Sequence, residues 1–143
     1  MSVKPSTFDT KAFFKSLNDA LAGLMSWSWD DRYDTVVGKF KRQNAEQVID
    51  ALERYFTAMW DPAVIETASE VEQEVNRQLG GIETGQALYT TDPNVGEIAF
   101  CAWWRWSDGK HFSLRIGASS FLPKGSATEE EIALLREIFN VEE

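Results

Sequence analysis

The segment from residue 96 to residue 121 constrains the fold more than any other part of the sequence, because it predicts a β-hairpin. Two runs of alternating residues, rich in aromatic and β-branched side chains, flank the turn sequence Ser107-Asp108-Gly109-Lys110. An Asp-Gly pair between two such runs is a strong short-range signal for a hairpin. We therefore expect this hairpin to form the centre of a β-sheet.

Two loop lengths compete at this turn, and they give different strand registers. A two-residue loop pairs Trp104 with Ser113 and mixes apolar and polar side chains on both faces. A three-residue loop with Gly109 in a bulge pairs Trp104 with Phe112 and collects the apolar side chains on one face. Because a shift of one residue would move half of that set to the other face, the pattern favours the bulged hairpin. Its expected apolar face consists of Ile98, Phe100, Ala102, Trp104, Trp106, Phe112, Leu114, Ile116 and Ala118, with Lys110 at the turn.

The opposite face of the predicted hairpin is mostly polar, and Trp103 is the unusual residue on it. An arginine guanidinium over an exposed indole ring contributes about 0.5–1 kcal/mol, so the simplest interpretation is that Trp103 stacks on Arg105 or Arg115. Trp and Arg are also enriched at binding hot spots, which makes a recognition patch the second interpretation. A third is that another element covers this face. The patch would comprise Trp103, Arg105, His111 and Arg115.

The first half of the chain predicts two helices. Ser6 or Thr7 can cap a helix that runs to about Met25. A capping-box-like sequence at Asn44 starts the second helix, whose apolar stripe extends to Trp60.

Two further helices are expected. One starts at Asp61-Pro62, where aspartate caps the helix and proline occupies its first position, and it ends at about Leu79. The other follows Thr128 and ends near Asn140.

The remaining segments predict strands. Residues 26–40 have the composition of an extended segment, interpreted as an edge strand that ends at Gly38, and residues 85–91 have that of a strand leading towards the hairpin. The expected fold is a single α+β domain over residues 1–143. Its antiparallel sheet of three or four strands is built on the central hairpin and packs against three to four helices. With 43% hydrophobic residues, the chain can form a packed core.

Acidic residues dominate the region of the second and third helices. Residues 44–83 contain nine acidic and two basic residues, whereas residues 96–124 contain four basic and two acidic ones. Glu66, Glu70 and Glu74 point away from the apolar seam of the third helix, because helical residues advance by about 100° each. The simplest interpretation is a solvated face. The alternative is an acidic ridge that contacts a basic partner.

The sequence contains no recognisable catalytic or metal-binding motif. Its one cysteine, Cys101, and its one histidine, His111, would lie about 13 Å apart on the hairpin, too far for proton transfer. No phosphate-binding loop, zinc-ligand spacing, EF-hand loop or serine-hydrolase elbow is present. We therefore expect no cofactor and no bound metal and favour a non-catalytic protein. Because acidic residues are plentiful, an enzyme that uses carboxylates stays open as a third hypothesis, for which the sequence names no residues.

Charge and targeting signals restrict the partners. A net charge of -9 argues against binding to nucleic acid or to an anionic membrane surface. The N-terminal residues lack the apolar run of a signal peptide, and no apolar stretch approaches the ~20 residues that span a bilayer. A single cysteine is typical of a reducing compartment, so we expect a cytoplasmic protein.

These properties favour a non-catalytic protein-interaction module whose partner is another protein, with a basic protein favoured by charge. In size and acidity the chain is similar to bacterial immunity proteins and secretion chaperones, which implies an inhibitor-like or chaperone-like role. A homodimer through the third helix or through an edge strand is compatible with the same pattern.

The alternative function is a small-molecule-binding domain. Its pocket would lie between the helices and the sheet and would be lined by tryptophans, of which the chain has six. The candidate pocket residues are Trp60, Trp104 and Trp106, with Trp27 and Trp29 as further candidates.

Overall fold

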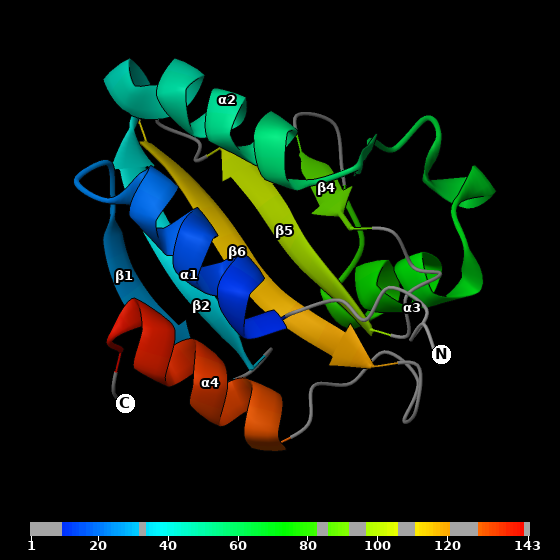
Figure 1. The fold of residues 1–143 in the computed structure, drawn as a ribbon. Helices are drawn as coiled ribbons and strands as arrows, with labels where there is room; N and C mark the ends of the chain where they lie inside the picture. The colour runs from blue at the N-terminus through cyan, green and yellow to red at the C-terminus, as the bar shows by residue number, and fades with distance from the viewer. Residues whose placement is uncertain are drawn as a thin grey trace, which may run out of the picture.

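The computed structural model of the protein describes residues 10–31, 34–82, 86–91, 97–105, 111–120 and 129–141. These residues form a six-stranded antiparallel sheet with the order β1-β2-β6-β5-β4-β3, accompanied by four α-helices (Figure 1). The α+β class is confirmed, and the sheet is larger than the expected three or four strands. The strands are β1 (Ser26–Asp30), β2 (Thr35–Lys41), β3 (Ala58–Trp60), β4 (Ala87–Thr90), β5 (Glu97–Arg105) and β6 (His111–Ser120). The helices are α1 (Thr10–Leu21), α2 (Ala45–Tyr55), α3 (Glu70–Gln78) and α4 (Glu129–Phe139), with short 3₁₀ turns η1 (Arg42–Asn44) and η2 (Ile65–Thr67).

The additional strands come from segments whose sequence pattern is weak or misleading. The segment after α1 forms two strands, β1 and β2, and β2 pairs with β6. The second helix ends at Tyr55, so Trp60 lies in β3, at the other edge of the sheet, and not on the helical stripe where we expected it. The backbone N–H of Thr57 donates to the carbonyl oxygen of Thr90 at 3.0 Å, which draws the chain into the sheet directly after the helix.

The helix ends also differ from the expected ones. Asn44 does not cap α2 through its side chain, and its Nδ2 instead donates to the carbonyl oxygen of Leu24 at 3.1 Å. The predicted third helix is divided into η2 and α3, because Ser69 starts a new helix with a complete capping box. In that box the Ser69 hydroxyl accepts from the backbone N–H of Glu72 while the Glu72 carboxylate accepts from the backbone N–H of Ser69.

The register of the central hairpin differs by one residue from the one we favoured. Trp104 pairs with Ser113 and Cys101 pairs with Ile116, which is the register of the two-residue loop. The turn itself, residues 106–110, lies outside the described residues. The pattern favours the bulged register only if a single face of the hairpin is apolar and buried. In the structure, apolar cores lie on both faces of this strand pair, so the bulged register is wrong.

The larger core lies on the face covered by α1, α2 and α4, which cross the sheet together in Figure 1. Strands β5 and β6 contribute Ala99, Cys101, Leu114 and Ile116 to this core, and all four side chains are fully buried. The smaller core lies on the opposite face, where α3 covers the β5–β4–β3 side of the sheet. Its buried members are Val75, Leu79, Leu88, Ile98, Phe100 and Ala102.

Two glycines in the sheet are covered by the aromatic ring of the residue directly opposite, one pair on each face. Gly38 pairs with Trp27, and Gly117 pairs with Phe100. A Cβ atom at Gly117 would lie 2.6 Å from the Phe100 ring, and one at Gly38 would lie 2.6 Å from the Trp27 ring. Both distances are far below the ~3.5–4.0 Å separation of carbon atoms in contact. A Cβ atom at either position would collide with that ring, and at Gly38 also with the sulfur of Met25, so glycine lets these side chains approach the sheet closely.

We expect Gly117→Ala to lower the free energy of unfolding by about 1–3 kcal/mol, the usual cost of an added methyl group in a packed core. Urea denaturation measures this change. The same substitution in a Phe100→Leu background should cost much less, because the ring that meets the new methyl group is gone. Equal losses in both backgrounds would show that the ring does not cause the effect.

Candidate interaction surfaces

Strand β3 is attached to α3 through a buried carboxylate. Glu72 is only 3% exposed, and its Oε2 accepts hydrogen bonds from Trp60 Nε1 at 2.8 Å and from Thr90 Oγ1. Its Oε1 accepts from Ser69 Oγ at 2.8 Å and from the Ser69 backbone N–H at 3.2 Å. Four donors therefore satisfy this charge, as a buried carboxylate requires. The network fixes β3 and β4 against the start of α3.

We expect Glu72→Gln to lower the free energy of unfolding by about 1–3 kcal/mol, because an amide places its own N–H groups against buried donors. Urea denaturation of this variant and of Glu70→Gln checks the expectation. The control makes the same chemical change at an exposed position of the same helix and should stay within about 0.5 kcal/mol of the parent protein. Equal effects in the two variants would contradict this role of Glu72.

Elements η2 and α3 also carry acidic residues that are at least partly exposed to solvent. Glu66 and Glu70 are exposed, and Glu74 is half-buried and forms an ion pair with Arg77. The amide of Gln73 donates to the carbonyl oxygens of Glu66 and Ala68, which holds η2 against α3. The three glutamates that the sequence singled out therefore belong to two adjoining elements, and a break in the helix separates Glu66 in η2 from the other two in α3.

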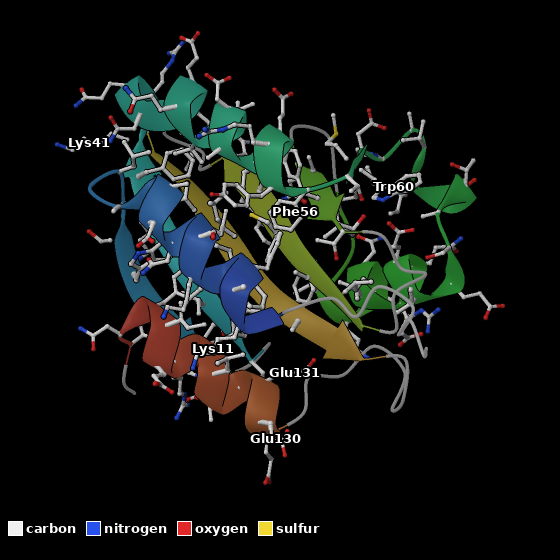
Figure 2. All side chains as sticks on the ribbon, in the orientation of Figure 1. Lys11, Lys41, Phe56, Trp60, Glu130 and Glu131 are labelled. Carbon is white, nitrogen blue, oxygen red and sulfur yellow. The ribbon has the colours of Figure 1, made fainter. Side chains whose placement is uncertain are left out.

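Two large apolar side chains are exposed in the segment between α2 and α3. Met59 in β3 is 52% exposed, and Val64 in the following turn is 41% exposed. Asp61 shapes that turn, since its Oδ1 accepts from the backbone N–H groups of Ala63 at 2.8 Å and Val64 at 3.1 Å. Trp60, labelled in Figure 2, is the residue directly before this turn. We use the name β3 surface for Met59, Asp61, Val64, Glu66, Glu70 and Glu74.

The proposed hairpin patch is not formed as predicted, because Trp103 and Arg115 lie on opposite faces of the sheet. Trp103 packs into the larger core against Phe40 and Phe112, with ring centroids 5.4 and 5.1 Å away. Arg115 instead lies over the ring of Trp104 at 4.7 Å from its centroid. The one-residue error in register explains this exchange of tryptophans. The side chains of Arg105 and His111 lie outside the described residues, and partner binding by the four residues stays a prediction.

Arg115 is held in place by Asp30 as well as by Trp104. Its Nε and Nη2 donate to Asp30 Oδ2 at 3.1 and 2.9 Å. The acid that follows Asp30 has a similar partner, because Asp31 pairs at 3.4 Å with Arg136, which lies over the Trp29 ring. Both acids at the end of β1 are therefore paired with arginines of the same chain, Asp30 in a part-buried pair and Asp31 in an exposed one.

The predicted tryptophan pocket is not tested by the described residues. Trp60 and Trp104 are half-buried and pack against the smaller core, whereas Trp106 lies outside the described residues. A surface depression of about 480 Å³ does occur between η2, α3 and Gly80-Gly81, but no tryptophan lines it. The small-molecule alternative stays a prediction, without a contact in the described residues that favours it.

The thiol and phenol groups in the larger core are held in their neutral forms. Cys101 is a fully buried free cysteine, and burial raises the pKa of its thiol far above the usual value. Burial also raises the pKa of Tyr89 to about 12, with smaller contributions from Cys101 and Glu53. Neither group is suited to act as a nucleophile near neutral pH. Among the described residues, no group of three potential ligands could hold a metal ion, and no helix could cross a membrane.

The pKa of Tyr89 predicts a loss of stability in alkaline solution. The phenol ionises near pH 10 in the unfolded state and near pH 12 in the folded state. The free energy of unfolding therefore falls as pH rises between these values. Compared with Tyr89→Phe, the parent protein should lose about 1 kcal/mol of unfolding free energy from pH 10 to 11, and the difference should be constant below pH 9. Denaturation of both proteins at several pH values measures it, and parallel pH profiles above pH 10 would contradict the assignment.

The sequence indicated the three glutamates of the β3 surface but not its exposed apolar side chains. Met59 fits the helical stripe that we expected for α2, so its exposure on a strand was missed. Glu72 is one of the nine acidic residues in 44–83, and its spacing Ser69-x-x-Glu72, which is that of a capping box, is the sequence signal that distinguishes it.

Comparison of this chain with protein-family models, with curated proteins and with solved structures found no match. Its function has to be inferred from the surfaces described above.

Proposed function

We propose that the protein is a non-catalytic interaction module that binds a basic partner protein through the β3 surface. The role is that of an inhibitor, immunity protein or chaperone, which covers part of its partner without changing it chemically. The cytoplasm is the proposed setting, and the single free Cys101, which forms no disulfide, supports it.

The observation that carries this proposal is a short segment in which acids without an ion-pair partner among the described residues occur together with exposed apolar side chains. Asp30 and Asp31 are neutralised by Arg115 and Arg136, which also stack on tryptophans. On the β3 surface, Arg77 pairs with Glu74, whereas Asp61, Glu66 and Glu70 have no ion-pair partner among the described residues. Residues 58–80 contain five acidic residues and one basic residue. Such a one-sided charge attracts a basic surface and accelerates encounter with it.

The apolar side chains on the same surface support a stable contact and not only an encounter. Protein interfaces combine an apolar centre with a polar rim, and methionine is enriched in them. Met59 and Val64 are exposed in the same segment of the chain as these acids and would supply that centre, with Met59 on the side of strand β3 that faces away from α3. The capping box and the Glu72 network keep the surface rigid, so little conformational entropy is lost on binding.

The test is an affinity purification from lysate of the native cells with the parent protein and with Glu66→Lys/Glu70→Lys. The parent protein should retain a partner in stoichiometric amount at low salt and release it at high salt. The variant should retain at least about tenfold less, because it reverses charges that attract the partner.

The matched control is Glu130→Lys/Glu137→Lys, which changes the net charge equally at exposed positions of α4. This control should retain the partner as the parent protein does. Equal retention by all three proteins, or loss with both variants, would rule out the β3 surface as the contact.

A further inference from the structure

Strand β3 is the last strand of the sheet, and within the described residues no strand pairs with its outer edge. An edge strand presents backbone N–H and C=O groups that can pair with another chain. Natural edge strands are usually protected by charges, prolines or bulges within the strand. The sequence Ala58-Met59-Trp60 contains no charge and no proline, and Asp61-Pro62 follow only after it.

From this edge we infer that the basic partner contributes an extended segment that binds as an additional β-strand along β3. This inference rests on the proposed function and specifies how its contact is made. Recognition by strand addition draws its affinity from main-chain hydrogen bonds and its specificity from alternate side chains.

The outer edge of β3 is already in place for such a strand, because hydrogen bonds hold both ends of β3. Trp60 is bonded to Glu72 and, at 3.1 Å, to Thr90 Oγ1. Thr57 is bonded to Thr90 through the backbone and through its hydroxyl. An isolated strand of three residues would not keep its geometry, whereas β3 is held by the buried network behind it. The template therefore exists before the partner arrives.

The two faces of β3 predict different side chains on the added strand. Met59 is paired with Tyr89, on the face of the larger core, whereas Trp60 packs against the smaller core beside α3. The start of α3 is linked to Trp60 through Glu72 and Ser69, which places Glu70 on that side. Because side chains alternate along a strand, we expect apolar residues beside Met59 alternating with basic residues on the α3 side.

Charge selects a basic segment over a second copy of this chain. The protein has a net charge of -9, and two copies joined at β3 would bring Asp61, Glu66 and Glu70 of each copy together. Like charges at an interface oppose such pairing. The opposite edge of the sheet, β1, does not share this selectivity, because its Asp30 is already paired with Arg115.

The test uses a synthetic peptide of about nine residues that alternates lysine and valine, a length typical of a long strand. Nuclear magnetic resonance of the full ¹⁵N-labelled protein follows its binding. The amide signals of Ala58, Met59 and Trp60 should shift more than those of β1. A peptide with N-methyl groups along one edge should bind at least about tenfold more weakly, because main-chain hydrogen bonds are lost. A peptide alternating glutamate and valine should not bind.

The outcomes separate the strand from the charged surface. If the N-methylated peptides bind as well as the parent peptide while Glu66→Lys/Glu70→Lys still weakens binding, strand addition is wrong and the acidic contact remains. If the basic peptide shifts β3 but the charge-reversed variant binds it equally well, the acidic contact is wrong and the proposed function fails. Absence of binding by the basic peptide overturns the inference directly.

Discussion

The pairing of β5 with β6 places Cys101 opposite Ile116 and Trp104 opposite Ser113, so this hairpin turns apolar side chains to both sides of the sheet. Each face of the sheet must therefore be buried by its own layer of helices. Helices α1, α2 and α4 cover one face, and α3 covers part of the other. The edge strand β3 depends on this second layer, because Trp60 is fixed by a residue of α3. The position of the candidate interaction surface thus follows from the register of two strands in the centre of the sheet.

The sequence was sufficient to predict the elements whose pattern is strong, namely the hairpin strands, the strand before them and the closing helix. It was not sufficient for the register, because residues that are distant in sequence decide whether a face is buried. A one-residue shift exchanges the two faces, which is why Trp103 was predicted beside Arg115 and Trp104 is found there. The Trp60 segment was misassigned for another reason: its apolar residues continue the helical period of α2, and tertiary pairing with β4 overrides that local preference.

The candidate site shows the same division. Charge is a property of composition, so Glu66, Glu70 and Glu74 could be nominated from the sequence alone. Whether an acid forms an ion pair within the protein or can contact a partner depends on the folded structure. Asp30 and Asp31 lie near arginines that are 85 and 105 residues away in sequence, and no local pattern indicates those pairs. Glu72, in the middle of the acidic segment, is withdrawn from the surface and serves the interior.

The acids around β3 have a consequence for the behaviour of the protein in solution. An open strand edge with an exposed methionine is an aggregation hazard, and here the nearest deterrent is electrostatic. That deterrent requires ionised carboxylates, and the sequence pI is about 4.6. Near this pH the molecules no longer repel one another, so colloidal stability and selectivity for a basic strand decline together. The same side chains that select a partner also keep the unoccupied protein dispersed.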